Sequence, residues 1–327
     1  MRVQIKNLLI SIFALSALLA QDIFDGYILF CPLTDGPITG GGENYSRIMD
    51  NDGNIINQWN HDRCAATAPY LMPDSTLICP FKIENPYIAG SAYGGKIIRY
   101  GWNGNILWEY DYSDTNYIQH HDIEPMSNGN ILIISWDRKT YLEVLASGRQ
   151  DVDGEMWPDK VVELQPIGLD SAIVVWEWKF WDHLIQDADP VFENYGVVSD
   201  HPELIDVNLG ELPLAQLGIS DWNHINSIDY NEEFDQIILS SRNMSEFYII
   251  DHSTTTEEAA SHNGGNSGKG GDFLYRWGNP QAYDRGSISW HNLDSQHGVN
   301  WIPEGYPGAG DLILFNNGYS SSQSAAF

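Results

Sequence analysis

Basic side chains are scarce in this 327-residue chain. Its 16 lysines and arginines are outnumbered by 45 aspartates and glutamates, which gives a net charge of −29 at pH 7. Because such a chain repels nucleic-acid phosphates, nucleic acid is excluded as an expected partner. Any site for an anion must therefore create its own positive field from a few local side chains.

Cysteine is also rare. The three cysteines all lie in the first quarter of the chain, at Cys31, Cys64 and Cys79. Their spacing matches no zinc motif, and none lies near the three histidine-bearing stretches considered below, so we expect no catalytic thiol. In an exported protein one disulfide and one free thiol are expected, and the sequence leaves the pairing open.

Long apolar runs are absent after the first twenty residues. Residues 8–20 are apolar, follow Arg2 and Lys6, and end before Gln21 and Asp22. A short basic start, an apolar stretch and a polar break predict a signal peptide over residues 1–20. The run is too short to span a membrane comfortably. We therefore expect residues 21–327 to form the domain of an exported protein, periplasmic or extracellular, with no membrane span.

Sustained helical periodicity is missing, and strand–turn–strand pieces recur instead. Residues 47–59 match 96–110, residues 161–178 follow the same pattern, and 272–277 supply the last strand of a fourth piece. Each piece ends in an aromatic residue: Trp59, Tyr110, Trp178 and Trp277. Alternating apolar and polar residues with Asp-Gly and Asn-Gly turns indicate antiparallel hairpins. Repeats of this length predict an all-β fold, a β-propeller.

The spacing of the repeats widens along the chain, which indicates insertions at residues 184–220 and 252–271. Long loops on a rigid scaffold usually lie over a site. Residues 297–315 begin a fifth unit, and the chain ends twelve residues later at Phe327. A propeller blade has four strands. We therefore expect four blades and a fragment, with the domain incomplete at its C-terminus.

Histidines stand at the start of three predicted strands, at His121, His224 and His297. The first strand of each blade lines the central channel of a propeller, so these imidazoles should converge there. His120 precedes His121, and the sequence does not decide which of the two faces the channel.

Two further polar residues accompany His224. Asn226 lies two residues later, on the same face of a strand, and Arg242 follows from the next strand of the hairpin. Imidazoles and a guanidinium can hold a tetrahedral oxyanion by charge-assisted hydrogen bonds. One imidazole can then act as a nucleophile toward sulfur or phosphorus.

Two alternatives use the same residues differently. Histidines from successive blades could ligate a metal, although Asp122 is the single carboxylate clearly placed to support them and Arg242 would repel a cation. A non-catalytic propeller could instead bind an anion or a protein partner. The remaining histidines are expected to be structural or at the surface: His61, His183, His201, His252, His262 and His291.

Several separated motifs occur together in a fixed order, at residues 221–230, 240–243, 250–253, 275–280 and 296–297. From about Gly26 to its end, the chain resembles the bacterial aryl-sulfate sulfotransferases. The resemblance implies a six-bladed propeller, of which about four and a half blades are present here. It also implies PAPS-independent transfer of a sulfuryl group from an aryl sulfate to a phenolic acceptor, with no cofactor.

The resemblance assigns roles by motif. His297 looks like a nucleophile that becomes sulfohistidine in a ping-pong reaction. The other catalytic residues implied are His224, Arg242 and His121, with Asn226 and His120 binding substrate and no metal ligand. The implied partners are small molecules, and the oligomeric state is not predicted.

Overall fold

The computed structural model describes residues 26–32, 44–88, 90, 93–152, 154–209, 220–318 and 323–327. The predicted signal peptide lies outside these residues. Within them, no helix is long and apolar enough to cross a membrane.

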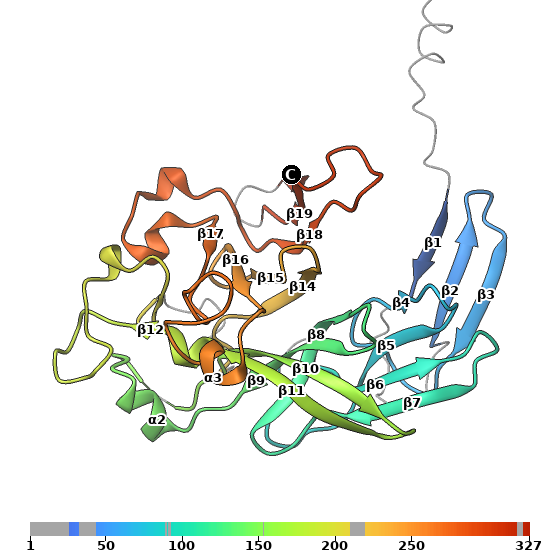
Figure 1. Ribbon diagram of the computed structural model, residues 1–327, viewed down its shortest axis with the longest axis horizontal. Coiled ribbons are helices and arrows are strands. Elements are labelled where there is room, and N and C mark those ends of the chain that lie inside the picture. Colours follow the sequence, from blue (N-terminus) through green and yellow to red (C-terminus); the bar gives the residue numbers. More distant parts are fainter. Residues whose placement is uncertain are drawn as a thin grey trace, which may run out of the picture.

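Five antiparallel sheets follow one another in chain order, and Figure 1 shows them arranged as the blades of a propeller. The prediction of an all-β propeller is therefore confirmed. The first sheet has three strands: β1 (Tyr27–Phe30), β2 (Tyr45–Asp50) and β3 (Ile55–Asn60). The second has four: β4 (Tyr70–Leu71), β5 (Leu77–Lys82), β6 (Gly95–Tyr100) and β7 (Ile106–Asp111).

The third and fourth sheets also have four strands, and the fifth has three. The third contains β8 (Tyr117–Pro125), β9 (Ile131–Asp137), β10 (Asp159–Ile167) and β11 (Ser171–Lys179). The fourth contains β14 (Ile225–Asn231), β15 (Gln236–Ser241), β16 (Glu246–Asp251) and β17 (Tyr275–Trp277). The fifth contains β18 (His297–Trp301), β19 (Leu312–Asn316) and β20 (Ala325–Ala326).

The aromatic residues that end the sequence repeats lie on the last strand of their sheets, as predicted, and tryptophans there join successive blades. Trp59 donates its indole N–H to the carbonyl of Gly101 at 2.9 Å, and Trp178 donates to Gly271 at 2.7 Å. In the second blade the residue that does this is Trp108, bonded to Ser171 at 2.9 Å, rather than Tyr110. Trp59 and Trp108 thus find acceptors on the neighbouring blade, and Trp178 finds one in the insertion between β16 and β17.

Apolar side chains fill the spaces between blades. Separate buried clusters form between the first and second sheets around Phe81, between the second and third around Ile133, and between the fourth and fifth around Val299. The largest lies between the third and fourth sheets and includes Trp178 and Trp222. The second, third and fourth sheets are thus covered by an apolar cluster on both faces, whereas the first and fifth sheets each have such a cluster on one face.

The two predicted insertions lie outside the blades. η1 (Phe180–His183) leads into the first, which contains the parallel pair β12 (Leu184–Ile185) and β13 (Ile205–Asp206), and η2 (Val198–Asp200). The second contains α3 (Thr256–Ala259), and α2 (Tyr141–Ala146) precedes β10. Both α-helices begin with a capping box, Thr140 with Glu143 and Thr255 with Glu258. The remaining short helices, η4 (Pro280–Tyr283) and η5 (Ile288–Trp290), lead to β18.

Candidate functional site

The first strands of three blades meet at the axis, where β14 contacts both β8 and β18. Each of these strands carries a break in its ladder beside a histidine. The register shifts between Gln119 and Ile123 in β8, between Ile225 and Ser227 in β14, and between His297 and Asn300 in β18. Such bulges re-aim side chains that a regular strand would point along the sheet normal.

Left-handed backbone conformations mark the same places. His121 has a φ of 47° and His224 a φ of 53°, which cost side-chain-bearing residues strain energy. In the fifth sheet the left-handed residue is Gly298, with a φ of 64°. His121 and His224 are therefore equivalent, whereas His297 sits one residue earlier in its blade. The equal offset that the sequence predicted for all three is wrong by one residue for His297.

His120 lies behind His121 rather than beside it. Nε2 of His120 is 2.7 Å from Oδ1 of Asp159, and its Nδ1 is 2.8 Å from Nδ1 of His121. The ring is fully buried and stacks on Trp136 at 4.1 Å between centroids. Because a carboxylate accepts only, Nε2 carries a proton, and a neutral His120 accepts from Nδ1–H of His121. His121 is the residue that reaches the other histidines, since its ring centroid lies 4.5 Å from that of His224.

His224 is oriented in a similar way by a carboxylate three residues earlier. Its Nδ1 donates to Oδ2 of Asp221 through a very short contact, and the other oxygen of Asp221 accepts the indole N–H of Trp136 at 3.0 Å. Trp136 therefore touches both the His120 ring and the Asp221 carboxylate. These buried partners hold the imidazole in one tautomer, with Nε2 available.

His297 donates Nδ1–H to the carbonyl of Ser295 at 3.0 Å, and the Asn317 side chain is a second hydrogen-bond partner of the ring. Burial lowers its pKa from 6.5, and the charges of His224 and Arg242 act in the same direction. Burial also lowers the pKa of His121 well below the usual range, with His224 as the next cause. His121 and His297 are thus neutral at pH 7. All three channel histidines are tied through Nδ1.

Asn226 and Gln296 fix the backbone next to His297. The amide of Asn226 donates to the carbonyl of Gln296 at 2.7 Å. The fully buried Gln296 donates to Ser241 O at 2.9 Å and to Glu246 O at 2.8 Å. In this arrangement one amide proton of Asn226 is used, and the other remains for a ligand.

Arg242 brings the positive charge. Its backbone N–H donates to the carbonyl of His224 at 3.0 Å, so it is held beside that residue. Its guanidinium donates to Asn243 Oδ1 at 3.2 Å, and within the described residues no carboxylate forms an ion pair with it. A guanidinium without a carboxylate partner, in a chain with a net charge of −29, is available for an anion.

Two carboxylates that orient the site were missed or misplaced by sequence reasoning. Asp159 comes from the third strand of its blade, and nothing in its local sequence marks it. Asp221 lies within the motif at residues 221–230, three residues before the histidine it holds. Asp122, which the sequence suggested as the supporting carboxylate, instead accepts from the hydroxyl of Tyr70 at 2.6 Å.

A metal does not suit this histidine group as well as an anion does. Among the described residues, the ligand atoms that lie within 4.8 Å of one another belong to His183, His262 and Asp272, outside the channel. Arg242 supplies a positive charge near His121 and His297, which opposes binding of a cation there.

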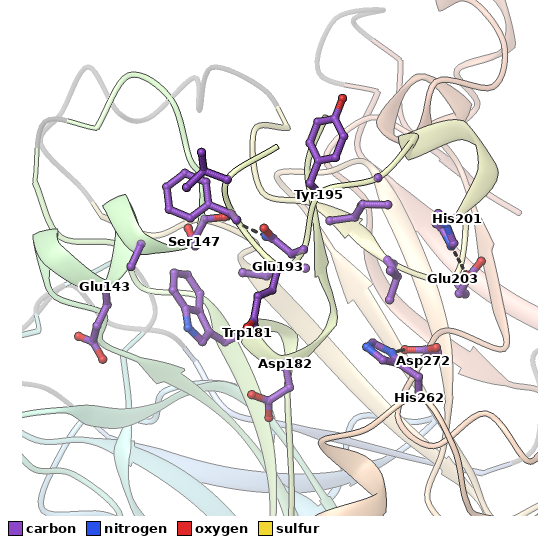
Figure 2. Close-up of a pocket in the computed structure, with 18 residues that line it drawn as sticks. Glu143, Ser147, Trp181, Asp182, Glu193, Tyr195, His201, Glu203, His262 and Asp272 are labelled. Atoms are coloured by element: carbon purple, nitrogen blue, oxygen red, sulfur yellow. Dashed lines mark hydrogen bonds and ion pairs between the residues drawn. The ribbon is translucent and has the colours of Figure 1, made fainter. Parts of the chain in front are cut away.

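A cavity of about 910 Å³ lies among the insertions and not at the channel histidines (Figure 2). Among the described residues, five carboxylates line it and no lysine or arginine does: Glu143, Asp182, Glu193, Glu203 and Asp272. Such a lining repels a sulfate ester. The cavity is therefore not the place for an anionic substrate.

Comparison with solved structures gives distant likenesses. Hydrazine synthase from Kuenenia stuttgartiensis is 11% identical with a TM-score of 0.46, over 88% of this chain and 66% of that one. A hypothetical selenium-binding protein from Sulfolobus tokodaii is 11% identical with a TM-score of 0.45, over 85% and 53%. A protein of unknown function from Bacteroides caccae is 9% identical with a TM-score of 0.40, over 89% and 65%. The chain spans about two thirds or less of these three chains.

No curated protein matches the sequence significantly. A family model gives the stronger result, because it covers residues 29–327, which include all five sheets except the first two residues of β1. All six site residues predicted from the sequence lie within the matched region. The protein belongs to the arylsulfotransferase (ASST) family.

Proposed function

We propose that this protein transfers a sulfuryl group from an aryl sulfate to a phenolic acceptor through a sulfohistidine at His297. The observation that carries the proposal is the convergence of Arg242, which forms no ion pair with a carboxylate among the described residues, with three imidazoles that are each held through Nδ1. Arg242 and the second amide proton of Asn226 suit the equatorial oxygens of a sulfuryl group. The family supports the sulfotransferase class.

In the first half-reaction, Nε2 of His297 attacks sulfur. The S–O bond to the aryl group breaks, and the phenolate leaves with the electron pair. Because His297 is neutral, its lone pair is available at pH 7. Arg242 offsets the negative charge that develops on oxygen in the transition state.

In the second half-reaction, an acceptor phenol occupies the vacated position. Its hydroxyl proton passes to Nε2 of His121, which is the acceptor nitrogen of that ring because Nδ1–H is committed to His120. The phenol oxygen then attacks sulfur, and the N–S electron pair returns to His297. Asp159 and His120 position His121 and keep its acceptor nitrogen toward the substrate.

The test uses p-nitrophenyl sulfate as donor and phenol as acceptor. We expect nitrophenol release, and a mass shift on the peptide containing His297 when the acceptor is omitted. His297→Ala should abolish both, whereas His201→Ala, an exposed histidine in an insertion, should change neither. Nitrophenol release that survives His297→Ala would overturn the proposal, and so would turnover without any sulfated histidine. The predicted export implies that the activity resides outside the cytoplasm, which cell fractionation can test.

A further inference from the structure

The insertion between β16 and β17 places two side chains against a third from η1. Nδ1 of His183, the last residue of η1, lies 2.8 Å from Oδ1 of Asp272, and Nδ1 of His262 lies 2.7 Å from the same oxygen. The three potential ligand atoms all lie within 4.8 Å of one another. His262 and Asp272 appear together at the edge of the cavity in Figure 2. Two imidazoles and a carboxylate, far apart in sequence, thus converge on one point.

The hydrogen bonds of His183 leave a lone pair directed at a carboxylate. Its Nε2 lies 2.9 Å from the carbonyl of Ala259, which can only accept, so Nε2 carries the proton. In the neutral ring Nδ1 is then an acceptor, and it faces the acceptor oxygen of Asp272. Two acceptors at 2.8 Å repel each other unless a cation or a second proton lies between them.

The surroundings of His183 are those of a metal-bound imidazole. A ligating histidine usually donates its other N–H to a carbonyl or carboxylate, and Ala259 takes that role here. The ring also lies parallel to Trp178, with 5.5 Å between centroids, which fixes its plane. Glycine is required at position 271, because a Cβ there would lie 2.0 Å from the carbonyl oxygen of Ala259 and 2.6 Å from Nε2 of His183. The ring is thus held in place before any ligand arrives.

The local charge favours a cation. The cavity beside Asp272 is lined by carboxylates without a compensating lysine or arginine. His183 and the Asp272 carboxylate are buried, whereas the His262 side chain is 56% exposed and faces the cavity. One side of the cluster is therefore rigid, and the other is open to solvent and able to move.

We propose that His183, His262 and Asp272 bind a divalent transition-metal ion, with Zn²⁺ as the best match to two imidazoles and a carboxylate. Tetrahedral ligands at about 2.0–2.1 Å from zinc lie roughly 3.3 Å apart. Both nitrogen–oxygen distances, now 2.8 and 2.7 Å, therefore lengthen slightly when the ion binds, and water from the cavity completes the coordination. The ion joins the insertion of the fourth blade to η1, which follows the third blade. The site is independent of the sulfuryl-transfer proposal.

The experiment titrates EDTA-treated, dialysed full-length protein with ZnCl₂ and measures stoichiometry calorimetrically and thermal unfolding by circular dichroism. We expect one Zn²⁺ per chain and a rise in Tm on saturation. Substituting Co²⁺ should give the visible absorption of a four- or five-coordinate ion. His262→Asn keeps a donor for Asp272 but is a poor zinc ligand, so it should weaken binding at least ~10-fold while folding normally. His262→Cys should restore binding.

The matched control is His201→Ala, which removes an exposed histidine lining the same cavity and paired with Glu203 at 2.9 Å. It should bind Zn²⁺ as the unsubstituted chain does. Absence of saturable binding would overturn the proposal, and so would equal affinity in His262→Asn and the unsubstituted chain.

Discussion

His120 donates Nε2–H to Oδ1 of Asp159 at 2.7 Å, and the same carboxylate accepts the backbone N–H of Ile225 from the next blade at 2.7 Å. One buried aspartate thus orients the histidine pair of the third blade and anchors the strand that begins beside His224. The hydrogen bond between His120 and His121 makes the tautomer of His121 depend on that of His120. Asp159, which does not reach the channel, therefore sets the tautomer of the histidine that does.

Asp159→Asn should reverse the direction of the two hydrogen bonds that join residue 159, His120 and His121, without breaking either of them. The asparagine oxygen can accept from Ile225, and its amide can donate to Nε2 of His120. His120 would then donate from Nδ1 to His121, which would present Nε2–H to the acceptor phenol instead of a lone pair. We expect turnover to fall roughly 10²–10⁴-fold, as for other tautomer reversals.

The measurement separates the two half-reactions. The p-nitrophenolate ion is a good leaving group that needs little proton assistance, so the initial burst of nitrophenol should persist in Asp159→Asn. Steady-state turnover with phenol should be lost, and thermal unfolding should show an intact fold. Unchanged turnover, or equal losses in burst and steady state, would contradict this reversal of the hydrogen bonds.

The propeller was predictable because its signals are local and repeated. Asp-Gly and Asn-Gly turns, alternating strands and aromatic strand ends recur in each blade, and Trp59 and Trp178 occupy the outer strands as expected. The channel histidines could be found because each begins the first strand of a blade. The one-residue shift of His297 relative to the other two could not be found from the sequence. In its blade the left-handed residue is Gly298, whereas in the other two blades it is the histidine itself.

Contacts between distant segments escaped prediction. Asp159 reaches His120 across the width of a sheet, and no spacing rule connects them. His183 and His262 were expected to be structural or at the surface, because nothing in the sequence shows that two insertions bring them to Asp272. Insertions do not repeat along the chain, so the sequence offers no second copy from which their geometry could be inferred. Residue clusters that they form are seen only in the structure.

On the acidic side of its pH–rate profile, the donor half-reaction should follow the protonation of His297. A neutral imidazole is needed for attack, and burial lowers the pKa of His297 below 6.5. The neutral form therefore persists to more acidic pH than usual, and the midpoint of the fall in kcat/KM for p-nitrophenyl sulfate should lie below pH 6.5. Arg242→Gln removes a positive charge that opposes protonation, so the limb should move to higher pH while the rate falls ~10²–10³-fold. A limb above 6.5 in the unsubstituted enzyme would count against His297 as nucleophile.

Glu124→Gln should stabilise the fold increasingly as pH rises. Burial, followed by the charges of Asp229 and Asp122, raises the pKa of Glu124 from 4.5 to about 9. Between these values the folded chain keeps a proton that the unfolded chain releases, so stability falls with rising pH. Glutamine removes that loss, and we expect a gain of about 1–3 kcal/mol at pH 7, since one pKa unit is worth ~1.4 kcal/mol.

Urea unfolding at pH 4, 7 and 8.5 measures this effect. The two chains should be close in stability at pH 4 and diverge at higher pH. Glu257→Gln, on the exposed face of α3, should give no such trend. A difference between Glu124→Gln and the unsubstituted chain that is the same at all three pH values would show that the substitution acts through packing instead.

Cys31 and Cys79 should form the disulfide whose pairing the sequence left open. The two thiols are close enough to affect each other's pKa, and both pack with the apolar cluster around Phe81. The hydrogen bond from Cys79 lowers the pKa of Cys31, whereas burial raises that of Cys79. The Cys31 thiolate therefore attacks oxidised glutathione first and releases one glutathione. Cys79 then displaces the second to close the cross-link.

Closing a loop of about 50 residues should stabilise the fold by up to ~4 kcal/mol in the chain-entropy model. Peptide mapping without reductant should find Cys31 joined to Cys79 after treatment with oxidised glutathione. Cys64→Ser should leave this product and the gain in Tm unchanged, and Cys31→Ser should abolish both. A cross-link through Cys64, or glutathione that stays on Cys31, would mean that the two sulfur atoms cannot reach bonding geometry between β1 and β5.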